Sequence, residues 1–278
     1  FNYKFVETEY RVPIICGINR LGELVTYDMA QTPHLLIAGE TGSGKSTQLR
    51  SILTHLILSR GPNELRLILG DMKLSEFHVF RGLAHVDALC YSADDIAEAL
   101  GEVSDELRRR GELLNKQGLA HISELNDPPP VIVVAIDEFA LLRDEKDVMR
   151  VIEDISAIGR ALDVYLILSQ QRADRDVMPG RLKQNLTVRM AFRHADKINS
   201  RITIGSHEAA DIGIEERGRF YLKRERLELL QGPFLSLKKA RALLKPYKVA
   251  KDNTSPKYAT SHKIDPLGLL GGDDDAQS

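Results

Sequence analysis

Two groups of residues in this chain have the types and spacing needed for phosphate chemistry. The first occupies residues 35–46, LLIAGETGSGKS, where an apolar stretch runs into the pattern G-x-x-x-x-G-K-[ST]. Glycines let backbone N–H groups curl around phosphate oxygens, and a helix beginning near Lys45 points its positive dipole end at the same anion. Lys45 supplies a positive charge to the outer phosphates, and the Ser46 hydroxyl is a ligand for Mg²⁺. A glycine-rich turn followed by a chance Lys-Ser is the alternative. The predicted nucleotide-binding residues are Gly39, Glu40, Thr41, Gly42, Ser43, Gly44, Lys45, Ser46 and Thr47.

The second group is the acidic pair Asp137-Glu138, which follows the continuous apolar run 131–136. An Asp at this place can hold the Mg²⁺ that bridges the outer phosphates, and the next carboxylate can orient an attacking water. A switch GTPase would favour Asp-x-x-Gly here and Asn-Lys-x-Asp later, and neither occurs. Solvated charge at a strand end is the alternative. Together with the loop upstream, the pair predicts hydrolysis of a nucleoside triphosphate with Mg²⁺, using Lys45 and Glu138 as catalytic residues and Ser46 and Asp137 as metal ligands.

Gln171 ends the next apolar stretch, and its amide could hydrogen-bond the γ-phosphate or the attacking water. We therefore include Gln171 among the predicted catalytic residues, with a plain strand-end cap as the alternative. Phosphoryl transfer also favours an arginine that offsets developing charge, often from a neighbouring subunit. The candidates are Arg109, Arg110 and Arg160, each of which alone could equally be a surface charge.

The strands and helices predicted around these residues must bring them together in the fold. Apolar stretches of strand length alternate with segments of helical periodicity, which predicts an α/β fold with a mostly parallel, doubly wound sheet. Nucleotides bind at the carboxyl ends of such strands, where residues 39–46, the pair Asp137-Glu138 and Gln171 would meet. Helices are expected over 94–116, 146–162, 197–204, 207–212 and 236–244, and a loop or short helix over 172–184.

Three regions follow from the chain order. Residues 1–32 alternate around glycines and predict a small β-rich N-terminal element. Residues 33–235 form the predicted α/β core that carries the nucleotide site. Residues 236–278 comprise a helix and a flexible tail, since the end of the chain is rich in Pro, Gly, Ser and Asp.

Composition is that of an ordinary soluble globular protein, with 43% hydrophobic and 28% charged residues among 278. The net charge of −2 gives no bulk electrostatic case for nucleic acid, although a few basic residues facing a ring's pore would suffice to track a phosphate backbone. Two cysteines and the lack of a signal-peptide layout fit a reducing compartment. We expect a cytoplasmic domain, with membrane association through an upstream segment of the full-length protein.

Several segments of this chain resemble the FtsK/SpoIIIE-type ring translocases. They are PHLL at 33–36, the loop 39–46, ELRRRGELL at 106–114, VVAIDEF at 133–139, LILSQQR at 166–172 and VRMAFRHADKINSR at 188–201. The resemblance implies a RecA-like P-loop core, a hexameric ring with ATP between subunits, and double-stranded DNA threaded through the pore. By position, Gln171 matches the family glutamine, and Lys45, Asp137 and Glu138 match its nucleotide motifs.

Two departures from the family refine the expected function. Ala173 replaces the usual proline, and nothing after residue 235 resembles the winged-helix module of chromosome-segregating members. The chain therefore looks more like the coupling proteins of conjugative elements, which would engage membrane or secretion-channel proteins as partners. The expected DNA contacts are Arg172, Arg175, Arg181 and Lys183.

Two other functions remain open. A protein-secretion ATPase of the same superfamily would bind signal sequences instead of DNA. A nucleotide-binding scaffold with a degenerate site is the non-enzymatic alternative, which the intact Lys45, Ser46, Asp137 and Glu138 disfavour.

Overall fold

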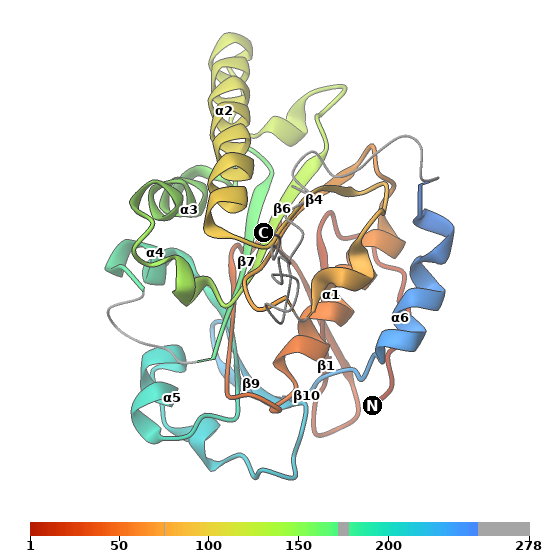
Figure 1. Ribbon diagram of the computed structural model, residues 1–278, viewed down its shortest axis with the longest axis vertical. Coiled ribbons are helices and arrows are strands. Elements are labelled where there is room, and N and C mark those ends of the chain that lie inside the picture. The colour runs from red at the N-terminus through yellow and green to blue at the C-terminus, as the bar shows by residue number, and fades with distance from the viewer. Residues whose placement is uncertain (75, 172–177, 250–278) are drawn as a thin grey trace, which may run out of the picture.

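The computed structural model describes residues 1–74, 76–171 and 178–249, and its strands form a single ten-stranded sheet in the order β2-β1-β10-β9-β8-β3-β7-β6-β4-β5 (Figure 1). The run from β8 to β5 is parallel, whereas β9, β10, β1 and β2 pair antiparallel. The strands are β1 (Pro13–Ile18), β2 (Leu24–Asp28), β3 (Leu35–Ala38), β4 (Leu65–Asp71), β5 (Val86–Cys90), β6 (Val131–Asp137), β7 (Val164–Gln170), β8 (Val188–Phe192), β9 (Arg219–Lys223) and β10 (Leu227–Gln231).

Helices cover both faces of the parallel part of the sheet. The helices are α1 (Lys45–Ser59), α2 (Ala93–Gln117), α3 (Lys146–Ile158), α4 (Gly180–Asn185), α5 (Lys197–Ile204) and α6 (Leu237–Leu244). Side chains alternate along each strand, so Leu35 and Ile37 pack with the core beneath α1, while Leu36 packs with the core beneath α2 and α3. This two-sided burial explains the continuous apolar strands and confirms the predicted α/β, mostly parallel sheet.

The N-terminal hairpin β1–β2 extends this sheet, because β1 pairs with β10 at Ile18 and Gln231. The sheet thereby continues past the parallel strands through the hairpin β9–β10. The boundaries at residues 32 and 235 remain a prediction, and residues 250–278 of the predicted C-terminal segment lie outside the described part of the chain.

Two predicted helices are shorter in the structure. α3 ends at Ile158, not near 162, because a tight turn follows, in which Val164 N–H donates to Gly159 O at 2.9 Å. A Cβ at Gly159 would stand 2.2 Å from Val164 O, so only glycine fits this turn. The segment 207–212 contains only a 3₁₀ turn, Glu208–Asp211.

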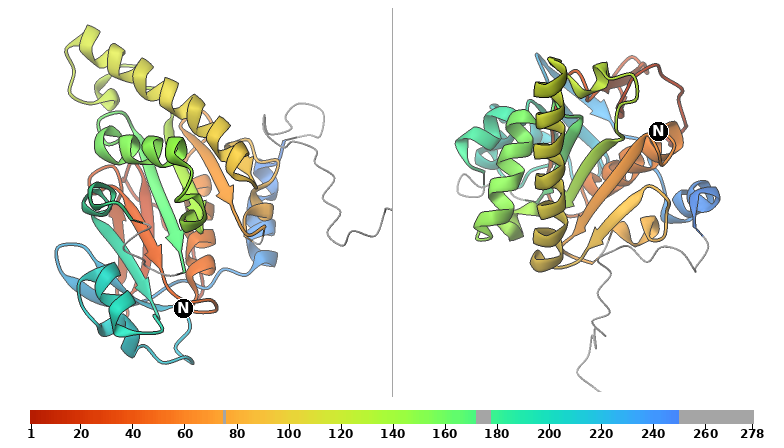
Figure 2. Two further views of the ribbon diagram at one scale, coloured as in Figure 1. Left: turned by 60° about the vertical axis from the view of Figure 1, so that its left-hand side comes forward. Right: turned by 90° about the horizontal axis from the view of Figure 1, so that it is seen from above.

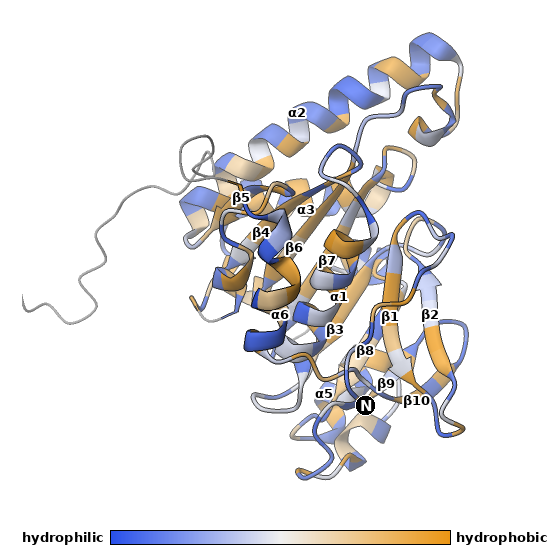
Figure 3. Ribbon diagram, turned by 90° about the vertical axis from the view of Figure 1, so that its right-hand side faces the viewer, coloured by the Kyte–Doolittle hydropathy of each residue, from blue (hydrophilic) through white to orange (hydrophobic). Residues whose placement is uncertain are grey.

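Helix α2 projects well beyond the sheet as a long rod (Figure 2). The Ser92 side chain caps its start by accepting from Asp95 N–H at 3.1 Å, and Gly118 ends it in a left-handed conformation. Hydrophilic and hydrophobic bands alternate along α2, whereas the central strands are mainly hydrophobic (Figure 3). Within the described residues, no helix combines the length and apolar character that a bilayer span requires.

Candidate active site

The predicted phosphate loop lies between β3 and α1, at the carboxyl edge of the sheet. Gly42 and Gly44 have φ values of 80° and 112°, which favour glycine. A Cβ on Gly44 would stand 2.7 Å from Gly218 Cα, so the loop and the start of β9 approach more closely than any side chain permits. Gly218 N–H donates to Ser43 O at 2.8 Å and fastens this approach. The loop therefore keeps the open curvature that phosphate oxygens require, and α1 begins directly at Lys45.

Lys45 and Asp137 meet at the floor of the site. The Lys45 ammonium donates to Ser169 Oγ at 3.1 Å, and Ser169 Oγ donates to Asp137 Oδ1 at 2.7 Å. Lys45 Nζ lies 3.5 Å from the same carboxylate oxygen, and both side chains are about 5% exposed. Burying a charged side chain costs desolvation free energy unless the charge is paired. The contact between the Lys45 ammonium and the Asp137 carboxylate offsets this cost, so both groups can be held at the floor of the site. The role of Ser169 was missed from the sequence, although a polar residue closing an apolar strand was a usable signal.

Glu138 occupies a constrained position directly after β6. Its backbone is left-handed, with φ 55° and ψ 50°, which is uncommon for a residue with a Cβ. Its carboxylate is bound from two sides: Lys73 Nζ lies 2.8 Å from Oε2, and Gln171 N–H donates to Oε1 at 3.1 Å. The side chain is only 8% exposed. The structure therefore fixes Glu138 through residues that follow β4 and β7.

A further carboxylate, Glu76, lies beside the predicted metal ligands. Burial raises the pKa of Glu76, while the nearby Arg50 guanidinium and the Ser46 hydroxyl oppose that shift. Arg50 Nη1 lies 2.9 Å from Glu76 Oε2, which ties this carboxylate to α1. The place of Glu76 after β4 is where such sheets present residues to ligands.

These groups surround a cavity of about 680 Å³. One wall is the loop and first turn of α1, and Lys73, Glu76, Asp137 and Gln171 form a second wall. The remaining wall comes from the start of β9 and from residues 231–234. The cavity is large enough for a nucleotide, and charged, polar and apolar residues line it.

The residues present suit Mg²⁺ as well as phosphate. Ser46 and Asp137 both line the cavity and offer the oxygen ligands that Mg²⁺ prefers. Across the described residues, no group of three or more His, Cys, Asp and Glu side chains could enclose a metal ion. So small a set of protein ligands, Ser46 and Asp137, fits an ion that shares its ligands with bound phosphates.

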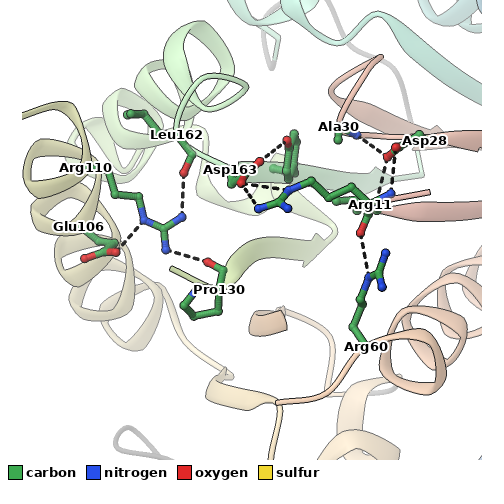
Figure 4. Close-up of polar contacts among 11 residues, drawn as sticks. Arg11, Asp28, Ala30, Arg60, Glu106, Arg110, Pro130, Leu162 and Asp163 are labelled. Atoms are coloured by element: carbon green, nitrogen blue, oxygen red, sulfur yellow. Dashed lines mark hydrogen bonds and ion pairs between the residues drawn. The ribbon is translucent and has the colours of Figure 1, made fainter. Parts of the chain in front are cut away.

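The structure corrects one predicted arginine. The Arg110 side chain is 1% exposed, and it donates to Leu162 O at 2.7 Å, Pro130 O at 2.8 Å and Glu106 Oε1 at 2.6 Å (Figure 4). All three contacts lie within the chain, so Arg110 is a structural residue and is not available to a neighbouring subunit. It fastens α2 to the segments that precede β6 and β7.

The other two arginine candidates remain on the surface. Arg109 is 57% exposed and paired with Glu106. Arg160 is exposed in the turn before β7, and therefore lies at the edge of the sheet opposite the phosphate loop. Neither joins the cavity of its own chain.

The predicted DNA-contact residues are only partly described. Arg172 and Arg175 lie outside the described residues. Arg181 is exposed and Lys183 half-buried on α4. Lys183 also lines a cleft of about 520 Å³ together with Arg201 and Lys223, so basic side chains gather beside α4 and α5.

Comparison with known proteins agrees with this geometry. Residues 2–128 match the sequence profile of the FtsK/SpoIIIE family. A DNA translocase FtsK from Borreliella burgdorferi is 35% identical over 214 residues, which cover 72% of this chain and 27% of the relative. The chain thus spans about a quarter of the length of the curated relatives it matches.

Two solved structures have the same fold as this chain and are more than 25% identical to it in sequence. The pCW3 conjugation coupling protein TcpA, determined with ATPγS, is 27% identical with a TM-score of 0.78, covering 89% of this chain and 73% of TcpA. The cytoplasmic domain of the type VII secretion ATPase EccC from Thermomonospora curvata is 26% identical with a TM-score of 0.76, covering 86% of this chain and 31% of EccC. The sequence segments, the RecA-like P-loop fold and these matches together show that the chain is similar to the FtsK/SpoIIIE family, over residues 2–128 for the family profile and over 214 residues for the Borreliella relative.

Proposed function

We propose that this chain is the ATP-hydrolysing motor domain of a double-stranded DNA translocase. The observation that carries the proposal is that Lys45, Asp137 and Gln171 line one nucleotide-sized cavity, while the Glu138 carboxylate accepts a hydrogen bond from Gln171 N–H. They come from the starts or ends of three different elements, so only the folded sheet brings them together. An arrangement of this kind suits phosphoryl transfer to water.

Each residue has a distinct part in the proposed reaction. Lys45 binds the outer phosphates through its ammonium group, and the loop's N–H groups hold the remaining oxygens. Ser46 and Asp137 would hold Mg²⁺, which offsets charge on the phosphates when bound. Glu138 orients the attacking water and accepts its proton, while the Gln171 amide hydrogen-bonds the γ-phosphate or the water.

DNA is the proposed cargo. The curated relatives named above are DNA translocases, and TcpA is a conjugation coupling protein. Arg181 and Lys183 lie on α4, outside the lining of the cavity, and supply positive charge for a phosphate backbone. We further propose a hexameric ring with ATP between subunits, acting in conjugative or other mobile-element transfer or in DNA segregation. It would act in the cytoplasm, anchored through membrane or secretion-channel partners.

A protein-secretion ATPase is the second candidate. It is favoured by the similarity to EccC, whose name identifies it as a secretion ATPase. Such an enzyme would hydrolyse ATP at the same site but would respond to a peptide.

The ATPase rate with and without linear duplex DNA tests the proposal. We expect turnover that rises when duplex is added, and no turnover in Lys45→Ala under either condition. DNA-indifferent turnover would favour the secretion function. Absence of turnover in the wild-type protein, with ATP bound, would show a nucleotide-binding scaffold.

A further inference from the structure

The cavity has a second end that the proposed reaction does not use. Lys73, Asp137 and Gln171 lie at its catalytic end, whereas Pro233 and Phe234 line it on the side of the first turn of α1. We propose that the Phe234 ring is the platform on which the purine base of the nucleoside triphosphate stacks. The inference rests on the proposed function and identifies the residue that holds the base of the nucleotide substrate.

The position of Phe234 is set by its backbone. Its N–H donates to Phe1 O at 2.7 Å, and its carbonyl accepts from Tyr3 N–H at 3.0 Å. The residues on either side are tied to α1, because Pro233 O accepts from Ser51 Oγ at 3.3 Å and Leu235 O accepts from Arg50 Nε at 3.0 Å. Phe234 is therefore held in a fixed place relative to the helix that begins at the phosphate loop.

The side chain of Phe234 is nevertheless open to solvent. Residue 234 is 58% exposed, while Pro233 and Leu235 on either side are buried. An aromatic ring left exposed at the wall of a cavity, on a rigid backbone, has an apolar face available to a ligand. Stacking on such a ring requires little reorganisation, because the surrounding hydrogen bonds already determine where it lies.

Two glycines of the cavity wall, Gly218 and Gly232, connect the phosphate loop to the segment that carries Phe234. Gly232 N–H donates to Gly218 O at 2.8 Å, and Gly218 in turn contacts Ser43 and Gly44 of the loop. A Cβ on Gly232 would stand 2.5 Å from Gln48 Oε1, so glycine is required for this close packing. A nucleotide whose phosphates occupy the loop can extend along this wall to Phe234.

The chemistry of this end favours a base over a sugar or a further phosphate. Phe234 and Pro233 offer apolar surface, and every base has a π-face that stacks on an aromatic ring. Purines offer the larger stacking area. Stacking uses the face of the base and does not distinguish the hydrogen-bonding groups at its edge. The affinities for ATP and for GTP should therefore both depend on the Phe234 ring.

Calorimetric titration of the intact chain with Mg·ATP and with Mg·tripolyphosphate separates base from phosphate binding. We expect Phe234→Ala to weaken ATP binding about tenfold, from the usual stacking contribution of a base on an aromatic ring. Tripolyphosphate binding should be unchanged, and Phe234→Tyr should bind ATP nearly as the wild type does. Phe5→Ala removes an exposed aromatic residue that does not line the cavity, and should bind both ligands normally.

Several outcomes would overturn the inference. Unchanged ATP affinity in Phe234→Ala would do so, as would an equal loss of tripolyphosphate affinity, which would show a disturbed loop. An altered sedimentation coefficient with unchanged ATP affinity would show that the ring contacts a second copy of the chain instead. If the wild-type protein bound neither ligand, the proposed function itself would fail along with the inference.

Discussion

Lys73 Nζ lies 2.8 Å from Glu138 Oε2, so the carboxylate proposed to orient water is paired with a cation from a different strand end. The pair spans β4 and β6, which are neighbours in the sheet. Since Glu138 also has a left-handed backbone, its side chain depends on such contacts to keep one orientation. Lys73 is therefore a positioning residue for the proposed reaction.

Lys73→Ala should lower kcat while leaving the KM for ATP little changed. A carboxylate without this partner samples other orientations, and misplacement of a catalytic group costs on the order of tenfold to a hundredfold in rate. Steady-state ATPase measurements check this. Lys73→Arg should retain most activity, and Lys238→Ala, on the exposed side of α6, should behave as wild type. Equal kcat values for Lys73→Ala and wild type would contradict the role.

Arg110→Ala should destabilise the fold by about 2–4 kcal/mol, because it leaves the buried carbonyls of Leu162 and Pro130 without donors. The matched variant Arg109→Ala removes an exposed ion pair and should cost less than about 1 kcal/mol. Urea unfolding measures both. Similar losses in the two variants would show that the Arg110 contacts contribute little.

Stability should fall as the pH drops from about 6.5 towards 4. Burial lowers the pKa of His34, His55 and His194 to about 4 each. Between these pH values the unfolded chain takes up protons that the folded protein does not, so stability is complete above pH 6.5 and is lost below it. Each of these histidines contributes up to about 1.4 kcal/mol per pH unit to the pH dependence of the free energy of unfolding.

Urea unfolding at several pH values measures this slope, and His34→Asn provides its control. The Asn amide oxygen can replace His34 Nδ1, which accepts from Leu166 N–H at 3.0 Å, but it does not titrate here. The variant should show a shallower slope. A flat profile in the wild-type protein, or the same slope in the variant, would argue against buried neutral histidines.

Arg181→Ala combined with Lys183→Ala should abolish stimulation of the ATPase by duplex DNA and spare basal turnover. Both residues lie on α4, away from the cavity that holds the catalytic groups. Turnover measured against DNA concentration tests this, with Lys238→Ala as a lysine control on α6. Persistent stimulation in the double variant would place the DNA contact elsewhere.

Local patterns in the sequence were sufficient to predict the fold class and the phosphate loop. Strand ends carrying Asp137 and Gln171 could be placed at one edge because parallel strands share their direction. The partners of Glu138 were harder to predict, since the approach of Lys73 depends on the order of strands in the sheet. Phe234 stands alone in the sequence, and only the pairing of distant segments brings it to the cavity.

The burial of Arg110 follows from its position on α2. It lies three residues after Leu107 and four before Leu114, and therefore on the apolar face of α2. Its charge suggested an exposed role, whereas its helical position indicated burial. The acceptors that make burial possible are backbone carbonyls from remote turns, which no sequence pattern reveals.

The most direct test of the account is binding and hydrolysis of γ-labelled ATP by Glu138→Gln, beside Lys45→Ala and the wild-type protein. We predict that Glu138→Gln retains bound, unhydrolysed ATP, that Lys45→Ala binds little nucleotide, and that the wild-type protein releases phosphate. Phosphate release by Glu138→Gln at the wild-type rate would contradict the account, because a different group would then orient the water.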